Sequence, residues 1–387
     1  MNNITKNIIH IGANDNDLKL FESQYVLRNG MSYNSYLIKD EKIAILDTID
    51  EGVTDIWLKK LEEVLVGNTP DYLIVSHMEP DHAYNIGMLA KKYPEMKIVG
   101  NMFTFNILSN FFDIDISERK VIVKEGDILD LGEHKLQFFM APMVHWPEVM
   151  VTYEQTEKIL FSADAFGKFG SLDVEDEWLP EARRYYIGIV GKYGMQVQAL
   201  LNKAANLDIK MICPLHGPIL KENLGYYIDK YNTWSSYEPE EDGVFIACSS
   251  IYGNTLKAAE KMSEILKEHG AKNVLLTDLT REDWAEAVAN AFKFSKLIIA
   301  SSSYNAGLFP PMEHFLGRLK ERNYQKRTVG IIENGSWAPS AGKCMKNILC
   351  EMKDINIIEP TVTIKSRMKE ENKIEMERLA EMLLQKQ

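Results

Sequence analysis

The hydrophobic pattern divides the chain into two parts with different rhythms. In the C-terminal part, short apolar runs alternate with amphipathic segments of helical period. The apolar runs are residues 244–248, 274–276, 297–300, 329–332 and 357–364. One amphipathic segment begins near Thr255 and ends at Gly270, a residue typical of helix C-termini. Five strands separated by helices predict an α/β, doubly wound parallel sheet.

The N-terminal part mixes strand and helix patterns less regularly. We expect strands at residues 36–38, 43–46, 73–75, 97–99, 121–123, 136–140, 149–153 and 159–162. Helical patterns cover residues 53–66 and 84–93. Many strands with few helices between them predict an α/β sandwich, in which sheets are covered by helices, and not a simple βαβ repeat.

A polar stretch separates the two parts. Residues 233–243 contain serines, acidic residues, a proline and a glycine, and they lack periodicity, which is typical of a linker. The 387 residues of the chain are enough for two hydrophobic cores. We therefore predict two domains, residues 1–240 and residues 241–387.

Charge and hydropathy disfavour some classes of binding partner. A formal net charge of −12 disfavours nucleic acid and anionic membrane, because both attract basic surfaces. No apolar run approaches the ~20 residues that cross a bilayer, and the first residues do not resemble a signal peptide. We expect a cytoplasmic protein that binds a small molecule or a protein partner.

The four cysteines do not form a metal-binding or disulfide pattern. Cys213, Cys248, Cys344 and Cys350 are scattered without a C-x-x-C pair. An iron site of rubredoxin or ferredoxin type needs four gathered thiolates, so this chain is not expected to contain one. Any iron would be held by histidine and carboxylate.

Four potential metal ligands lie within six residues, directly after the apolar run 73–75. They are His77, Glu79, Asp81 and His82. Side chains can converge where a strand opens into a loop, and imidazole with carboxylate suits iron, zinc or manganese. The alternative is that His77 and His82 merely cap a helix or satisfy backbone groups.

Three more candidates each follow a later apolar run. His145 follows residues 136–140, Asp164 follows residues 159–162, and His216 follows residues 211–213. Taken singly, each could be an ordinary polar residue. Their repeated position just past a strand end favours one shared metal site.

This series of residues resembles the metallo-β-lactamase fold, an αβ/βα sandwich, in the variant used by flavodiiron proteins. Glu79 stands where the zinc hydrolases of that fold have histidine, and three carboxylates favour iron over zinc. The resemblance implies one iron on His77, Glu79 and His145, a second on Asp81, His82 and His216, and Asp164 bridging both. In some members of the family the residue that matches His82 turns away from the metal. The resemblance therefore leaves open whether His82 is a ligand in every state.

Two aromatic residues are candidates for catalytic support. Trp146 directly follows a predicted ligand, and Tyr193 lies in a segment similar to one that supplies a supporting tyrosine in the family. Ordinary aromatic core is an equally good interpretation of both.

Three loops after apolar runs of the C-terminal part suit a phosphate-containing cofactor. Hydroxyls and backbone N–H groups at a helix N-terminus bind phosphate without a basic residue, although serine and threonine also serve as plain helix caps. In a flavodoxin-like strand order, the loops after strands one, three and four meet at one edge. The predicted cofactor-binding residues are Ser249, Ser250, Ile251, Tyr252, Gly253, Asn254 and Thr255 in the first loop, Ser303, Tyr304, Asn305, Ala306 and Gly307 in the second, and Asn334, Gly335, Ser336 and Trp337 in the third.

The second loop and the residues after it resemble the flavodoxin-like, five-stranded FMN domain of flavodiiron proteins. The stretch 304–311 carries this resemblance. Two departures are visible: Ala306 stands where glycine is common, and residues 334–339 differ from the usual glycine-rich loop. The resemblance implies FMN as cofactor.

For the whole chain, the resemblance implies an oxygen or nitric oxide reductase that gives water or N2O. FMN would relay electrons from an external donor, either rubredoxin, a rubredoxin reductase system or a reduced deazaflavin, in a head-to-tail homodimer or a dimer of dimers. One alternative is a zinc metallo-hydrolase with a redox-regulatory flavodoxin module. Another is an electron carrier or gas sensor without turnover. Nothing in the sequence distinguishes O2 from NO.

Overall fold

A computed structural model describes residues 2–385. Its contacts divide the chain into two compact units, the first made of Met1–Tyr186 and Met195–Asn232 and the second of Ile187–Gly194 and Thr233–Gln387. The short segment Ile187–Gly194 joins the second unit through hydrogen bonds from Arg322 and Asn323 to its carbonyls. The domain limits 1–240 and 241–387 stay a prediction.

The first unit contains a seven-stranded sheet in the order β1-β2-β7-β8-β9-β10-β11. The strands β8 to β11 pair in parallel, and the other pairs are antiparallel. The strand bounds are β1 (Asn2–Asn3), β2 (Ile8–His10), β7 (Tyr36–Ile38), β8 (Ala44–Leu46), β9 (Tyr72–Ile74), β10 (Lys97–Gly100) and β11 (Lys120–Ile122).

A second sheet of the first unit has five strands in the order β12-β13-β14-β15-β16. They are β12 (Ile128–Asp130), β13 (Lys135–Met140), β14 (Met150–Glu154), β15 (Ile159–Phe161) and β16 (Met211–Cys213). Two small hairpins add β3 (Ala13–Asp15) with β6 (Met31–Tyr33), and β4 (Leu20–Phe21) with β5 (Tyr25–Val26). Leu46 and Ile74 from the first sheet and Phe138 and Phe161 from the second belong to one buried cluster. The two sheets therefore pack against each other.

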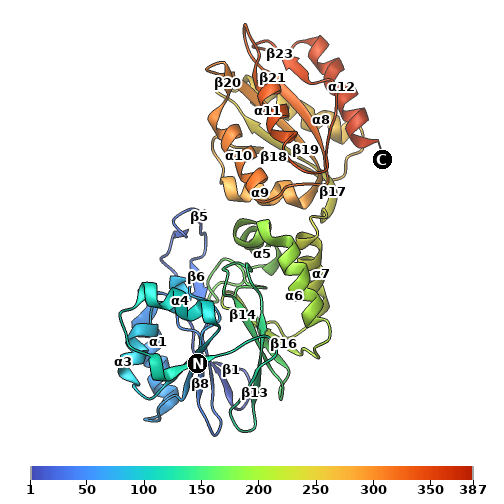
Figure 1. Ribbon diagram of the computed structural model, residues 1–387. Helices are drawn as coiled ribbons and strands as arrows, with labels where there is room; N and C mark the ends of the chain where they lie inside the picture. The colour runs from blue at the N-terminus through green and yellow to red at the C-terminus, as the bar shows by residue number, and fades with distance from the viewer. Residues whose placement is uncertain (1, 386–387) are drawn as a thin grey trace. The chain divides into compact units, whose positions relative to one another are not determined.

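Helices lie on both sides of this pair of sheets (Figure 1), which confirms the predicted sandwich. Helix α1 forms because Trp57, Leu61, Val64 and Leu65 repeat at helical spacing and are buried, and it ends at Val66 in the left-handed conformation. The helices are η1 (Glu51–Val53), α1 (Thr54–Leu65), α2 (Pro80–Ala83), α3 (Ile86–Lys92), α4 (Met102–Phe111), η2 (Ser117–Arg119), α5 (Trp178–Tyr185), α6 (Gly194–Ala204) and α7 (Leu224–Ser235). The short helices η3 (Tyr186–Val190) and η4 (Gly191–Tyr193) lie almost entirely in the segment that belongs to the second unit.

The second unit has the expected doubly wound sheet, with strand order β18-β17-β19-β21-β22 and parallel pairing. The strands are β17 (Glu241–Ser249), β18 (Val274–Asp278), β19 (Phe294–Tyr304), β20 (Gly307–Leu308), β21 (Arg327–Asn334), β22 (Ile355–Ile357) and β23 (Val362–Ile364). The single run predicted at residues 357–364 is wrong in one respect, because β22 and β23 are separate strands that both pair with β21. Pro360 lies between them, and proline lacks the N–H group that a continuous strand needs.

Helices of the second unit follow the predicted pattern. Helix α8 buries Ala258, Met262 and Ile265 on one face, and Gly270 follows it in the left-handed conformation. The helices are α8 (Asn254–Glu268), α9 (Trp284–Lys293), α10 (Pro310–Glu321), α11 (Ala341–Leu349) and α12 (Glu370–Leu384). Within residues 2–385, none of the helices has the length and apolar character needed to cross a membrane.

The stretch predicted as a linker is more ordered than expected. Residues 233–235 complete α7 and residues 241–243 begin β17. Trp234 in the last turn of α7 and Tyr237 just after this helix are buried. The largely polar composition of residues 233–243 therefore gave no indication that two large aromatic side chains are buried there and fix the path of the backbone.

Candidate metal centre and cofactor cleft

Four side chains converge at strand ends of the first unit. His77 follows β9, His145 follows β13, Asp164 follows β15, and Glu79 immediately precedes α2. His145 Nε2 lies 2.9 Å from Glu79 Oε2 and 3.0 Å from Asp164 Oδ2. His77 Nε2 lies 3.5 Å from each of the same two oxygens. The four ligand atoms lie within 4.8 Å of one another, so this first group could hold one metal ion.

A second group contains Asp81 and His82 on α2 and His216 after β16. His216 Nε2 lies 3.2 Å from Asp81 Oδ2 and 3.0 Å from His82 Nε2, and His82 Nε2 lies 3.4 Å from Asp81 Oδ2. His216 Nδ1 is 2.8 Å from the carbonyl oxygen of Ser32. When Nδ1 donates to this carbonyl, Nε2 is left free to bind a metal.

Asp164 faces both groups. Its Oδ2 atom lies near His77 and His145, and its Oδ1 atom lies 3.9 Å from His82 Nε2 and 4.0 Å from His216 Nε2. A carboxylate with one oxygen toward each group has the geometry of a ligand between two ions.

The charges of the two groups act on each other in a buried setting. Burial alone would raise the pKa of Asp164, but His77 and His145 hold it well below its usual value. Burial alone would lower the pKa of His145, but hydrogen bonds to Asp164 and Glu79 raise it to about 10. Burial and the charge of Glu79 raise the pKa of Asp81 to about 6. Such perturbed groups are typical of functional sites.

Several buried polar atoms here have no hydrogen-bond partner among the described residues. They include His77 Nε2, both carboxylate oxygens of Asp81, and Asp164 Oδ1. A buried polar atom without a partner costs about 1–3 kcal/mol. Metal ions would give these atoms partners, and a set of imidazoles and carboxylates suits iron, manganese or zinc. The side chains present therefore fit a pair of metal ions.

Two buried carboxylates that the sequence analysis missed hold the ligand-bearing loop. Asp47 accepts hydrogen bonds from the N–H group (2.7 Å) and the hydroxyl (2.6 Å) of Ser76. Glu148 accepts one from the N–H group of Met78 at 2.8 Å. Asp47 directly follows β8, so its position past a strand end was a signal that could have found it. The sequence around Glu148 has no such signal.

Tyr185, at the end of α5, is a third site residue that the sequence did not indicate. Its ring centroid lies 5.5 Å from that of His216. Its buried hydroxyl has no hydrogen-bond partner in the described part of the chain. Burial raises the pKa of this phenol well above its usual value, and the charges of Asp164 and Glu79 raise it further. The hydroxyl therefore stays protonated next to the second group.

The two aromatic residues proposed from the sequence lie in different units. Trp146 follows His145 in the first unit, and its carbonyl oxygen accepts a hydrogen bond from the Met143 N–H group at 2.8 Å. Tyr193 ends η4 in the second unit, where the Lys192 ammonium lies 5.9 Å from the centre of its ring. Their catalytic roles stay predictions.

A cleft of about 600 Å³ opens at the carboxyl edge of the parallel sheet in the second unit. It lies at the N-terminus of α8, where Thr255 Oγ1 is 2.8 Å from Ser302 Oγ. Tyr252 and Trp337 on its rim are each 93% exposed, so their rings are free to contact a ligand. The residues of the three predicted loops that line it are Ser250, Ile251, Tyr252, Asn254, Thr255, Ser303, Tyr304, Asn305, Ala306, Asn334, Gly335, Ser336 and Trp337.

Three other predicted cofactor residues shape the loops without lining the cleft. The Ser249 hydroxyl is buried against that of Ser301, at 2.8 Å. Gly253 caps α8 with φ of 86°, which glycine adopts without strain, and Gly307 pairs with Tyr304 in β20. The cleft also includes residues absent from the predicted set, namely Ser302, Ala338, Pro339, Ser340 and Ser366. Ser366 is distant in sequence from the three loops, so no loop motif could have indicated it.

Comparisons with known proteins agree with this architecture. A family model described as ODP family beta lactamase matches residues 31–217. An uncharacterized protein of Methanocaldococcus jannaschii is 29% identical, over 95% of this chain and 94% of that protein. A putative diflavin flavoprotein of Nostoc is 30% identical over 83% of this chain, which spans 56% of that longer protein. The anaerobic nitric oxide reductase flavorubredoxin of Vibrio vulnificus is 26% identical, over 95% of this chain and 76% of that protein.

Solved structures have the same fold along the whole chain. A mutant of the flavo di-iron protein from Thermotoga maritima matches with a TM-score of 0.88 and 26% identity, covering 97% of this chain and 95% of the other. Rubredoxin oxygen:oxidoreductase from Desulfovibrio gigas matches with a TM-score of 0.92 and 24% identity, covering 99% and 97%.

Fold and site together define a class of protein with a metallo-β-lactamase-like domain followed by a flavodoxin-like domain. Within that class, the chain belongs to the flavodiiron proteins. The cofactors that this family implies are two irons and FMN. The donor set of the two metal-binding groups and the hydroxyl-rich cleft at the N-terminus of α8 fit them.

Proposed function

We propose that the chain is an oxidoreductase that reduces O2 to water, NO to N2O, or both, at two irons, with FMN relaying electrons from an external donor. The observation that carries the proposal is the position of Asp164, whose two oxygens face different groups of ligands. A hydrolytic zinc site of this fold is disfavoured by Glu79, because an additional carboxylate suits iron better than zinc.

The roles of the side chains follow from their grouping. His77, Glu79 and His145 would hold one iron, Asp81, His82 and His216 the other, and Asp164 both. When bound, the irons and the flavin together supply up to four electrons, as many as O2 needs with four protons to give two waters, whereas two NO need two electrons and two protons to give N2O and water. The hydroxyl of Tyr185, kept protonated beside His216, is a hydrogen-bond donor available at this site.

The proposal extends to partners. Two comparison proteins have names that contain rubredoxin, which supports rubredoxin or a similar small redox protein as the electron donor. We also propose a head-to-tail homodimer or a dimer of dimers, which the resemblance to flavodiiron proteins implies, and a cytoplasmic location, which the sequence analysis predicts.

The test begins with the content of metal and flavin in protein produced with iron and zinc both present. We expect about two irons and one FMN per chain by elemental analysis and flavin release. The reduced protein is then mixed with O2 or with NO in separate anaerobic experiments, and gas consumption is followed over many turnovers. Two zincs with phosphodiesterase or esterase activity would replace this proposal with a hydrolase, and a single turnover would replace it with a gas sensor or electron carrier.

A further inference from the structure

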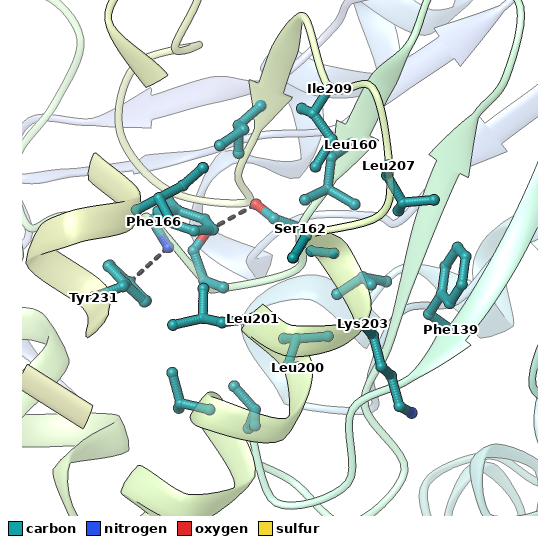
Figure 2. Close-up of a pocket in the computed structure, with 18 of the residues that line it drawn as sticks. Phe139, Leu160, Ser162, Phe166, Leu200, Leu201, Lys203, Leu207, Ile209 and Tyr231 are labelled. Carbon is teal, nitrogen blue, oxygen red and sulfur yellow. Dashed lines mark hydrogen bonds between the residues drawn. The ribbon is translucent and has the colours of Figure 1, made fainter. Parts of the chain in front are cut away.

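The first unit contains an apolar cavity of about 210 Å³ between its second sheet and helices α6 and α7 (Figure 2). Phe139, Leu160 and Ile212 reach it from the outer face of the sheet, and Leu201 and Tyr231 reach it from the two helices. The opposite side chains of the same strands, such as Phe138 and Phe161, face the core between the two sheets. The cavity is thus separate from that core.

Polar groups in the cavity wall already have partners. The Ser162 hydroxyl donates to the carbonyl of Ala165 at 2.7 Å, and the Tyr231 hydroxyl accepts from the Phe166 N–H group at 2.5 Å (Figure 2). The Lys203 ammonium donates to the Met140 carbonyl at 2.8 Å. Water is retained in a cavity when it finds two to four polar partners, whereas cavities lined by leucine, isoleucine and phenylalanine stay dry and bind apolar ligands. This wall therefore favours an apolar occupant over water.

The cavity shares a wall with the metal-binding groups. Ser162, Ala165 and Phe166 line the cavity and surround Asp164 in sequence, and Val144, another lining residue, directly precedes His145. Ala163 and Phe166 adopt φ of 51° and 67°, so the backbone turns sharply on either side of Asp164. The turn directs Asp164 toward the metal ligands while its neighbours face the cavity. The charge of Asp164 also contributes, after burial, to raising the pKa of Tyr231, whose hydroxyl meets the Phe166 N–H group.

The cavity opens toward solvent at its helical end. Ile228, which lines it from α7, is 37% exposed, whereas the lining residues beside Asp164, namely Ser162, Ala165 and Phe166, are buried. A water molecule occupies ~30 Å³ of the liquid, so the cavity has room for a few diatomic molecules. O2 and NO are small, uncharged and poorly solvated by water, which makes an apolar pocket with these dimensions a favourable place for them.

We propose that this cavity binds the diatomic gas substrate and delivers it to the metal centre past Ala165 and Val144. The inference rests on the proposed function, because it identifies the route by which that substrate arrives. The cavity raises the local concentration of gas next to Asp164 and His145, so it acts on the apparent affinity for the gas and not on the chemical step.

Xenon binding tests the cavity independently of activity. Crystals of the whole protein under xenon pressure, or xenon NMR in solution, should show one site between α6 and the second sheet. In Ala204→Leu the added side chain enters the cavity, so xenon binding should be lost. Ala199→Leu is the matched control, because Ala199 lies on the same helix but is exposed and outside the cavity.

Steady-state kinetics with the same variants tests delivery. In Ala204→Leu we expect the KM for the gas to rise about threefold to tenfold with kcat unchanged, and in Ala199→Leu we expect neither to change. Ala205→Leu, at the exposed rim, gives a second filling variant that does not disturb the core. Absence of xenon from the wild type, or loss of xenon with an unchanged KM, would overturn the inference. A wild type that binds xenon in the cavity but consumes neither gas would instead contradict the proposed function.

Discussion

The metal centre and the cofactor cleft are built in opposite ways. The metal centre consists of buried or nearly buried side chains that lie against one another, and Asp164 faces both groups. The cleft of the second unit consists mainly of loops, and its most prominent side chains, Tyr252 and Trp337, are exposed. A site of buried side chains depends on residue type at each position, whereas a site of loops depends on backbone path.

This difference predicts how each site responds to substitution. In the metal centre, removing one side chain leaves charged partners buried without compensation, which is costly. In the cleft, a cofactor would be held by many separate backbone and hydroxyl contacts, so removing one contact leaves the others in place. We expect large losses from single changes in the first site and graded losses in the second.

The largest expected effect is that of Asp164→Ala. Because this carboxylate faces both groups, the variant should lose most of both metals, from about two ions per chain to fewer than one. Elemental analysis of the purified variant measures this, with Asp208→Ala, which removes an exposed carboxylate, as the control. If the two sites respond independently, the flavin content of Asp164→Ala stays unchanged. A variant that still binds about two metal ions per chain would contradict the role of Asp164 as a ligand of both groups.

Asp47→Asn tests whether residues behind the ligands matter almost as much as the ligands. Asparagine has one acceptor oxygen and no charge, so it cannot accept both hydrogen bonds from Ser76 and it removes a negative charge next to His77. We expect metal affinity to fall about 10–100-fold, the usual effect of such supporting residues. Competition with a chelator measures the affinity. An affinity within twofold of wild type would contradict this role for Asp47.

Thr255→Val tests the graded response of the cleft. The substitution keeps the shape of the side chain and removes the hydroxyl at the N-terminus of α8, so FMN affinity should fall about tenfold, or ~1.4 kcal/mol. Flavin fluorescence titration of the apoprotein gives the affinity. Ser263→Ala, on the same helix outside the cleft, should leave it unchanged. Complete loss of FMN binding in a folded Thr255→Val would remove the contrast between the two sites.

The smallest expected effect concerns a charge pair of the first unit outside the metal centre. His134 Nδ1 lies 2.8 Å from Asp40, and this hydrogen bond raises the pKa of His134 despite burial. Hydrogen bonds from the His134 backbone N–H group and, after it, from Nδ1 lower the pKa of Asp40 to about 2, although burial opposes them. The raised pKa of His134 means that its stabilisation is complete below the ordinary value of 6.5 and is lost as the pH rises through the folded-state pKa. The lowered pKa of Asp40 means that its stabilisation is present above 3.8 and is lost as the pH falls toward 2.

His134→Gln should therefore lower the melting temperature by roughly 2–4 °C near pH 5.5 and by less at pH 8.5. Differences between wild type and variant, measured at equal metal content, isolate the pair from the metal centre. A decrease that grows with pH would contradict the assignment of charge to His134.

The sequence predicted the metal ligands well because several of them lie close together along the chain. Four ligand types within six residues at His77–His82 are rare without a site, and His145, Asp164 and His216 were found because each follows an apolar run. Strands β13, β15 and β16 run in the same direction, so the positions just past their ends lie at one edge of the sheet. The doubly wound parallel sheet of the second unit was predicted from the alternation of apolar runs and helices.

The remaining features depend on packing that no local pattern records. Tyr185 lies on an amphipathic helix, where an aromatic residue looks like ordinary core. The apolar cavity is a space left between helices and sheet. The sequence pattern of its lining residues would be the same if these residues were closely packed. Trp234 and Tyr237 were hidden in a polar stretch because composition averages over the few residues that are buried.

The ligands of the metal centre come from strand ends of two different sheets. His77 follows β9 of the first sheet, and Asp164 and His216 follow β15 and β16 of the second. An ion that binds only when both sheets are in place favours the folded chain over the unfolded one. A chain without metal is then unfolded for a larger fraction of the time, and proteases cleave the unfolded state. Iron supply would therefore govern how long each molecule survives in the cell.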